Sequence, residues 1–223
     1  PMLQHIIERT LWSKRVDHVM VATTIKNEDD LIANLCQKLG VDCYRGSEND
    51  VLDRFYQAAK QFDAENIIRV TADCPFIDPE IIDKIINIHM KGNFDYKSNI
   101  LVETYPDGLD VEVFKFSALK EAWEKAFLVS EREHVTPYIK FKGNFTRFSV
   151  ELETSLADKR WTVDTPRDFE AIEKIYCALY SGDKIFLMND ILAYLEKNPW
   201  IEEINADFKR NEGYMKSIEN DYT

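Results

Sequence analysis

The chain has 223 residues, of which 28 are Lys or Arg and 40 are Asp or Glu, so its formal net charge is −12. This acidic balance disfavours nucleic acid and anionic membranes as partners, and any phosphate group must be bound locally by a few basic side chains or a metal ion. No signal-like segment and no apolar run approaching the about 20 residues that cross a bilayer is present, and the four cysteines form no C-x-x-C pair, so a soluble cytoplasmic protein with reduced thiols is expected.

Short β-type runs alternate with longer helical runs along the chain, which indicates an α/β domain. Helices are expected at 2–13, 28–39, 51–62, 79–91, 117–127 and 166–180, and strands at 16–24, 41–45, 66–73, 94–98, 111–116, 144–151 and 160–164. The alternation predicts a mostly parallel sheet with helices on both faces.

The character of the sequence changes after Gly182. Residues 183–223 have helical spacing and many charges, and no further strand is expected there. We therefore expect an α/β domain at 1–182 and a helical C-terminal extension at 183–223. The aromatic residues Tyr194, Trp200 and Phe208 lie on apolar helix faces, which favours packing against the main domain or a second copy of the chain over ligand binding.

Two aspartates close predicted strands: Asp73 ends "NIIRVTAD" and Asp164 ends "RWTVD". Ligands of open α/β sheets bind outside the carboxyl ends of the strands. In the second motif, Thr165 is the expected N-cap of a helix and Asp168 completes its capping box, so Asp164 is not needed as the cap. A hard cation binds one or two carboxylates and fills its other positions with water and phosphate oxygens, so the pair predicts a magnesium–nucleotide site. The alternative is that each aspartate only caps a turn.

Basic side chains occur in two other polar stretches. Arg54 lies just inside the helix that follows the loop "YRGSEND", where it could contact an anion or pair with Asp50. Arg132 and His134 lie in "SEREHVTPYI", which indicates either a salt-bridged surface turn or a binding site for a carboxylate or phosphate.

The stretch "YPDGLDVEVF" combines a turn with alternating acidic and apolar residues. It is typical of a hairpin with one polar face, and the functional alternative places Glu112 near the substrate. The chain has no G-x-S-x-G, H-E-x-x-H, G-x-x-x-x-G-K-[ST] or G-x-G-x-x-G motif, so hydrolase, zinc-protease, P-loop and Rossmann hypotheses lack their fingerprints.

Six stretches together resemble, in order and spacing, the cytidylyltransferase-like family typified by the spore-coat polysaccharide biosynthesis protein SpsF. They are "PMLQHIIER", "GSENDVLDRFYQAA", "RVTADCPFIDPEIID", "YPDGLDVEVF", "EREHVTPYI" and "WTVDTPRDFEAI". The resemblance covers about residues 1–180 and extends more distantly to the cytidylyltransferases of sialic acid and 3-deoxy-manno-octulosonate. It implies a three-layer α/β/α nucleotide-diphospho-sugar transferase fold. It also implies a strand and a phosphate-binding loop before residue 1, so we expect the domain to lack its N-terminal strand and loop.

The resemblance further implies magnesium-dependent transfer of a cytidylyl group from CTP to a sugar or sugar acid in surface-polysaccharide biosynthesis. Asp73 and Asp164 would hold the magnesium ion. The expected contacts to nucleotide or sugar are Asp53, Arg54, Glu112, Arg132 and His134. Related enzymes often dimerise, so a homodimer is also expected, by analogy alone. Two alternatives stay open: a glycosyltransferase that uses a nucleotide-sugar donor, and a non-catalytic module that binds a nucleotide sugar.

Overall fold

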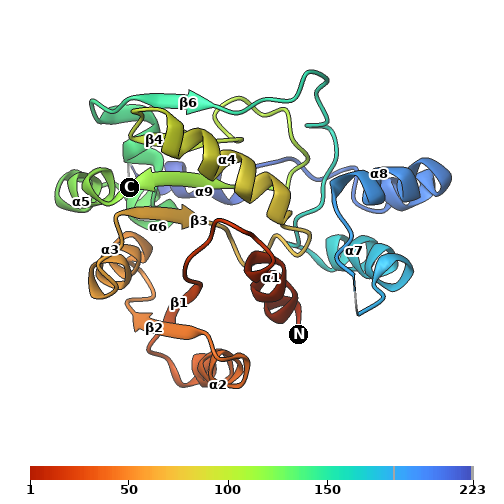
Figure 1. The fold of residues 1–223 in the computed structure, drawn as a ribbon, viewed down its shortest axis with the longest axis horizontal. Coiled ribbons are helices and arrows are strands. Elements are labelled where there is room, and N and C mark those ends of the chain that lie inside the picture. The colour runs from red at the N-terminus through yellow and green to blue at the C-terminus, as the bar shows by residue number, and fades with distance from the viewer. Residues whose placement is uncertain (183, 222–223) are drawn as a thin grey trace.

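The strands of the computed structural model form two sheets (Figure 1). The structure describes residues 1–182 and 184–221; residue 183, where the C-terminal extension is expected to begin, and residues 222–223 lie outside the described residues. The first sheet contains β1 (Met20–Thr24) and β2 (Asp42–Gly46), paired in parallel. The second has the order β3-β5-β4-β6, with β3 at Asn66–Arg69, β4 at Tyr96–Ser98, β5 at Glu112–Lys115 and β6 at Arg147–Ser149.

The four-stranded sheet is mixed. Strand β5 runs antiparallel to both β3 and β4, whereas β4 and β6 are parallel. The connection from β4 to β5, residues 99–111, contains no helix, whereas the crossover that joins two parallel strands usually contains one. This connection explains why β5 is the antiparallel member of a sheet that the alternating pattern predicted to be mostly parallel.

The strand expected at 160–164 is not formed, which corrects the sequence prediction. Its backbone is instead bonded to two loops: Trp161 N–H donates to Asp107 O at 2.7 Å, and Val163 N–H donates to Asp73 O at 2.9 Å. The only bridge in that stretch of the described chain is a single parallel one between Asp107 and Arg160. The segment is extended but forms no strand, because its neighbours are loops. Loops do not supply the continuous ladder of backbone partners that a strand needs.

Most expected helices are present, with shifts of one or two residues at their ends. The helices and helical turns are α1 (Met2–Leu11), η1 (Asn27–Asp29), α2 (Asp30–Leu39), α3 (Val51–Gln61), α4 (Pro79–Lys91), α5 (Phe116–Lys125), α6 (Val129–His134), η2 (Tyr138–Lys142), α7 (Pro166–Leu179), α8 (Met188–Lys197), η3 (Pro199–Ile204) and α9 (Glu212–Asn220). The N-terminus of α7 has the expected capping box, in which Thr165 accepts a hydrogen bond from the Asp168 N–H.

The three layers arise because side chains along each strand point alternately to the two faces of the sheet. On β5, Val113 belongs to a core cluster that includes Ile82 and Ile85 of α4, whereas the next residue, Phe114, belongs to a second cluster that includes residues of α3 and α5. Ile67 and Ile68 of β3 divide in the same way between the two clusters. Successive strand residues point to opposite faces, so the sheet lies between two helical layers.

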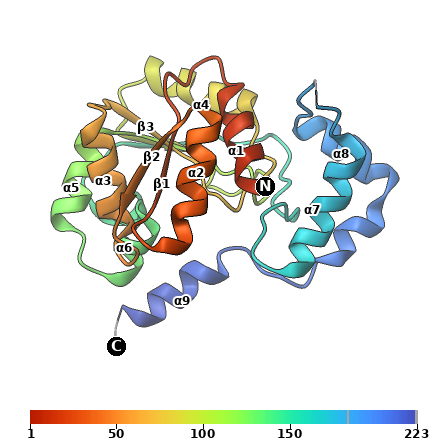
Figure 2. The same cartoon turned by 90° about the horizontal axis from the view of Figure 1, so that it is seen from below.

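The C-terminal segment packs back onto the α/β domain. Ile191 and Leu195 of α8 and Ile201 of η3 are buried in the core cluster that also contains α4 and α7 residues. Figure 2 shows the chain continuing from the α7–α8 group to α9, which lies near α6. Among the residues that the structure describes, no helix combines the length and apolar character that crossing a membrane requires. The expected homodimer stays a prediction.

Candidate functional site

Three chain segments that are far apart in sequence lie side by side beyond the carboxyl end of β3. They are residues 71–75, 105–110 and 159–164. Gly108 lets the middle segment approach the third closely: its φ is +102°, and a Cβ built there would lie 2.5 Å from the backbone carbon of Trp161. Only glycine fits this combination of backbone angle and contact. The contact fixes the position of the aspartates on either side of the turn.

Four aspartates gather on these segments: Asp73, Asp107, Asp110 and Asp164. Burial raises the pKa of Asp110 to about 7, and the negative charges of Asp107 and Asp73 add to the increase despite the opposing effect of Arg210. Burial likewise raises the pKa of Asp107 to about 6, with Arg210 and Arg160 opposing it and Asp164 and Asp73 adding to it. The charges of Asp73 and Asp164 therefore both act on the same residue, Asp107. The structure places the segments that carry Asp73 and Asp164 side by side, and a cation shared by the two carboxylates stays a prediction.

Arg160 provides much of the positive charge that balances this cluster. Its guanidinium lies 3.2 Å from Asp107, 2.8 Å from Asp164 and 2.8 Å from Asp168. The Asp168 side chain is fully buried, and it also accepts a hydrogen bond from the Asn205 side chain at 2.8 Å. Burial alone would raise the pKa of Asp168, but the hydrogen bonds from Arg160, Asn205 and Thr165 outweigh it and lower the pKa to about 2. Asp168 is therefore ionised at neutral pH and holds Arg160 beside Asp164.

A second arginine reaches the cluster from the C-terminal segment. Arg210 lies 2.7 Å from Asp110 and 3.6 Å from Asp107, and it donates to the carbonyl oxygen of Tyr105 at 3.1 Å. Since Arg210 is 100 residues away from Asp110 in sequence, only the return of the chain across the domain brings them together. The C-terminal segment thus contributes directly to the charge of the site.

Asp73 and Asp164 both carry carboxylate oxygens, which are the ligand type that a hard divalent cation prefers. Within the described part of the chain, the carboxylate of Asp73 has one protein partner, a weak 3.4 Å contact from the Cys74 thiol. The Asp164 side chain is 56% exposed and pairs with Arg160. No group of three or more His, Cys, Asp or Glu side chains among the described residues is arranged to hold a metal ion. Two carboxylates that leave positions for water and phosphate oxygens are the arrangement that magnesium accepts with nucleotides.

Glu112 and His134, two of the predicted contact residues, lie further along the same edge. Glu112 is the first residue of β5 and is 1% exposed, with Arg69 at 3.3 Å and Lys140 at 3.1 Å. His134 contacts the Ser217 hydroxyl of α9 at 2.9 Å. Burial is the main cause that lowers the pKa of His134, with a further contribution from Arg69, so the imidazole is neutral at pH 7.

The other three predicted contact residues lie on α3 and α6, away from the acidic cluster. Arg132 is bonded to Asp50 at 2.5 and 3.0 Å, and Asp53 accepts a hydrogen bond from the Trp123 indole at 2.8 Å. These contacts join α3 to α5 and α6. Asp50 therefore pairs with Arg132, not with Arg54 as one sequence hypothesis had it.

Arg54 faces the loop before α3, where its Nη1 donates to Ser47 O at 3.2 Å; its buried Nε–H has no acceptor among the residues that the structure describes.

Sequence reasoning missed several residues of the site. Asp107 and Asp110 had a signal, because Asp107 lies in a predicted turn and Asp110 follows it, in a stretch already noted for its acidic residues. Arg69 could also have been found, since it lies four positions before Asp73 on the same predicted strand. Arg160 begins the predicted strand that ends at Asp164, but its contact with Asp107 is not encoded locally. Nothing in the sequence around Arg210 indicates that its side chain contacts the acidic cluster.

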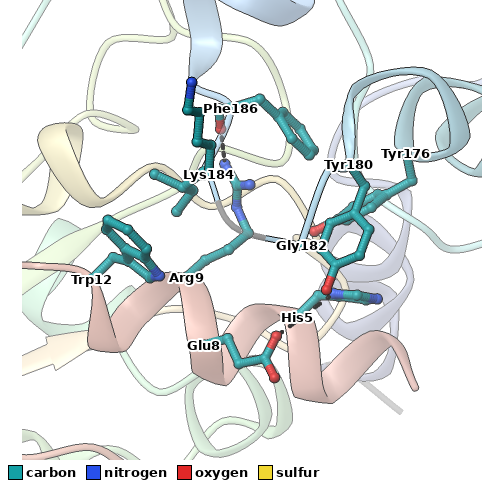
Figure 3. Close-up of a pocket in the computed structure, with 10 residues that line it drawn as sticks. His5, Glu8, Arg9, Trp12, Tyr176, Tyr180, Gly182, Lys184 and Phe186 are labelled. Carbon is teal, nitrogen blue, oxygen red and sulfur yellow. Dashed lines mark hydrogen bonds and ion pairs between the residues drawn. The ribbon is translucent and has the colours of Figure 1, made fainter.

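A separate hollow lies between α1, the end of α7 and the α7–α8 connection (Figure 3). Arg9 at its base is 5% exposed and donates to the carbonyl oxygens of Ile77, Phe76 and Phe186. Its guanidinium also lies 4.6 Å from the ring centre of Phe186. These contacts hold α1 against the domain, so Arg9 has a structural role.

Comparison with known proteins assigns the family. A family model described as Cytidylyltransferase matches residues 1–207. The chain is 42% identical to the uncharacterized protein MJ1063 of Methanocaldococcus jannaschii over 216 residues, which cover 94% of this chain and 85% of that protein. It is 29% identical to the spore coat polysaccharide biosynthesis protein SpsF of Bacillus subtilis over 207 residues, covering 89% of this chain and 82% of that protein.

A solved cytidylyltransferase from Leptospira borgpetersenii has a similar structure. The TM-score is 0.85 at 32% sequence identity, and the match covers 90% of this chain and 85% of that one. The mixed sheet between two helical layers, the similar solved structure and the match of the family model over most of the sequence agree with one another. This chain belongs to the cytidylyltransferase family.

Proposed function

We propose that this nucleotidyltransferase transfers a cytidylyl group from CTP to a sugar or sugar acid in surface-polysaccharide biosynthesis, with magnesium held by Asp73 and Asp164. The observation that carries the proposal is that the bond from Val163 N–H to Asp73 O joins the segments bearing these two carboxylates, whose charges both raise the pKa of Asp107. The similarity to SpsF supports the assignment to polysaccharide biosynthesis.

The reaction is a substitution at phosphorus. A hydroxyl oxygen of the acceptor forms a bond to the α-phosphorus of CTP, the bond from that phosphorus to the bridging oxygen of the β-phosphate breaks, and pyrophosphate leaves. The acceptor hydroxyl loses its proton to a base or to solvent. Catalysis of such a transfer depends on positioning and on neutralising the phosphate charge, and magnesium supplies that neutralisation when it is bound.

The chain's own residues hold the reacting groups in place. Asp168 fixes Arg160, and Arg160 in turn orients Asp164 at 2.8 Å. The backbone hydrogen bond from Val163 N–H to Asp73 O sets the spacing of Asp73 and Asp164. We place the reaction in the cytoplasm, where CTP is made, and the four free thiols agree with a reducing compartment.

Pyrophosphate release tests the proposal. The protein is incubated with CTP, magnesium and a panel of sugars and sugar acids, and release above a no-acceptor control is the expected result. Release with UTP or ATP in place of CTP should be much weaker. A glycosyltransferase would instead consume a nucleotide-sugar donor without producing pyrophosphate, and a binding module would do neither. Either of these results would contradict the proposal.

A further inference from the structure

Residues 205–211 lead from the α7–α8 group to α9 (Figure 2), and we call them the connecting segment. At its start, the Asn205 side chain donates to the carbonyl oxygen of Arg160 at 3.3 Å. At its end, the Asn211 side chain donates to Glu103 at 2.8 Å. The connecting segment therefore contacts two of the three loop regions around the acidic cluster.

Arg210 is the residue of the connecting segment that pairs with the aspartates. Its guanidinium lies 2.7 Å from Asp110 and 3.6 Å from Asp107, and its Nη1 donates to Tyr105 O at 3.1 Å. The Arg210 side chain is 11% exposed, so solvent and salt screen these ion pairs only weakly. The family model matches residues 1–207, so Arg210 lies outside the part of the chain that the match covers.

A row of alternating charges leads from Arg210 to Asp164. Asp107 pairs through Oδ1 with Arg210 Nε at 3.6 Å and through Oδ2 with Arg160 Nη1 at 3.2 Å. Arg160 in turn donates from Nη2 to Asp164 Oδ2 at 2.8 Å. The first three side chains of the row are at most 12% exposed, whereas Asp164 is 56% exposed. The row therefore begins in the interior and ends at a carboxylate that a ligand can reach.

Backbone hydrogen bonds keep Asp107 beside Arg160. The Asp107 N–H donates to Lys159 O at 3.0 Å, and the Trp161 N–H donates to Asp107 O at 2.7 Å. The two loops are thus bonded to each other at the point where the row of charges crosses between them. A change in the charge or position of the Asp107 carboxylate will therefore act directly on Arg160.

The way in which Arg160 divides its nitrogens leaves one oxygen of Asp164 free. Nε and Nη2 donate to Asp168, Nη2 also donates to Asp164 Oδ2, and Nη1 donates to Asp107. Among the described residues, none donates a hydrogen bond to Asp164 Oδ1. A guanidinium with two nitrogens available binds a carboxylate through two parallel N–H bonds. If Asp107 no longer held Nη1, that nitrogen would bind Asp164 Oδ1 and close this carboxylate to a cation.

Arg210 helps to keep Asp107 charged and paired with Arg160. Burial raises the pKa of Asp107 to about 6, and the charges of Asp164 and Asp73 add to the rise. Arg210 is the largest influence that opposes the rise, followed by Arg160. Without Arg210, the buried carboxyl group would hold its proton to a higher pH and would bind Arg160 less firmly.

From this arrangement we infer that Arg210 is a positioning residue for the cation: it keeps Asp107 on Arg160, so that one oxygen of Asp164 stays free. The inference rests on the proposed function, because it takes Asp164 as a ligand of the cation. Arg210 acts through Asp107 and Arg160 and not by contact with a substrate. The C-terminal segment is then part of the machinery of the site.

The direction of the effect separates positioning from simple charge. Removing a positive charge near a cation site favours cation binding when charge alone acts. Positioning predicts the opposite, so Arg210→Gln should weaken Mn²⁺ binding in the presence of CTP about 10-fold to 100-fold, as for other residues that orient metal ligands. Electron paramagnetic resonance of the free Mn²⁺ measures the affinity. Unchanged or tighter binding would overturn the inference.

Two further variants make the result specific to Arg210. Arg210→Lys keeps the charge but not the planar fork, and it should recover part of the lost affinity. Asp207→Asn is the matched control, since Asp207 lies on the same connecting segment and makes an exposed pair with Arg167 at 2.6 Å. It should bind Mn²⁺ like the wild-type protein, and an equal loss in this control would contradict a specific role of Arg210. Circular dichroism and urea denaturation confirm that each variant is folded under the assay conditions.

A double-substitution cycle tests the route through Asp107. If Arg210 acts through Asp107, adding Arg210→Gln to Asp107→Asn should weaken Mn²⁺ binding much less than Arg210→Gln does in the wild-type protein. A merely structural role of Arg210 would give no such dependence. Equal weakening in both backgrounds would therefore overturn the inference.

Pyrophosphate release separates failure of this inference from failure of the proposed function. Arg210→Gln should lose turnover at low magnesium and recover part of it as magnesium is raised, with the KM for the acceptor little changed. If no acceptor gives pyrophosphate but Arg210→Gln weakens Mn²⁺ binding, the proposed transfer is wrong and the positioning role stands. If the wild-type protein releases pyrophosphate and Arg210→Gln keeps both turnover and Mn²⁺ affinity, the proposed function stands and the inference is wrong. Absence of Mn²⁺ binding by the wild-type protein would contradict both.

Discussion

Two arginines, Arg9 in the hollow beside α1 and Arg69 at the carboxyl edge of the sheet, are both largely buried but use their donors differently. Arg9 donates to three backbone carbonyl oxygens and lies against an aromatic ring (Figure 3). Arg69 makes one hydrogen bond to Glu112, and its Nε–H has no acceptor in the described part of the chain. A concave shape is therefore a weaker sign of function here than polar groups that the protein leaves unsatisfied.

The same contrast holds for the acidic side chains. At the edge of the sheet, the Asp73 carboxylate has little protein contact, whereas the buried Asp168 is fully engaged with Arg160, Asn205 and Thr165. Asp73 is thus available to a ligand, and Asp168 has the structural role. Substitutions at the two kinds of position should separate activity from stability.

The largest effect is expected for Asp73→Asn. Removing one of the two metal-binding carboxylates should reduce pyrophosphate release about 1,000-fold, since metal neutralisation of phosphate charge contributes several kcal/mol. The melting temperature should change little, because the carboxylate makes almost no protein contact. Asp63→Asn is the control, since Asp63 is exposed and its φ of +50° suits Asn equally well. A variant with normal turnover would remove Asp73 from the mechanism.

Arg160→Met should destabilise the protein by about 3 kcal/mol, because the fully buried Asp168 would lose its main charged partner. Urea denaturation measures the change. Turnover should also fall, since Asp164 would no longer be oriented. The double substitution Arg160→Met with Asp168→Leu should recover stability without recovering turnover. If it recovers neither, the network is not what limits stability.

Arg9→Met should cost about 2 kcal/mol of unfolding free energy, because buried carbonyl oxygens would lose their donor. Turnover per folded molecule should match the wild-type value. Asp73→Asn should do the reverse and lower turnover without lowering stability. The two variants therefore distinguish the hollow beside α1 from the carboxyl edge of the sheet. A large loss of turnover with unchanged stability would make the hollow a functional site.

A smaller effect is expected from the pH dependence of Asp110. Burial raises its folded-state pKa to about 7 from the ordinary value of 3.8, so between these values the folded protein holds a proton that the unfolded chain has released. The free energy of unfolding should therefore fall by about 1.4 kcal/mol per pH unit as pH rises from about 4 to about 7. Asp110→Asn should lack this part of the decrease. Urea titrations of both proteins in EDTA give the difference, and parallel curves would contradict the assignment.

The helices could be predicted from sequence because their signals are local. Pro79 at a helix start and the Thr165–Asp168 box each lie within a few residues of what they determine. The expected strand at 160–164 could not be corrected locally, since its backbone partners are loop residues 54 and 90 positions earlier. Its apolar alternation is the same whether it pairs with a strand or with loops.

The charge network was beyond sequence reasoning for the same reason. Glu112 was predicted to lie near the substrate, but its two cationic partners come from β3 and η2, 43 and 28 residues away. Arg210 reaches Asp110 across 100 residues. Such contacts depend on how whole elements pack, and helical or strand periodicity carries no information on which distant charges will meet.

The central claim is that Asp73 and Asp164 share one divalent cation in the presence of nucleotide. Titration of Mn²⁺ into the protein with CTP, followed by electron paramagnetic resonance, measures this binding without requiring an acceptor. We expect tight Mn²⁺ binding by the wild-type protein that both Asp73→Asn and Asp164→Asn greatly weaken, with Asp63→Asn unchanged. Equal Mn²⁺ binding by all four proteins would contradict it.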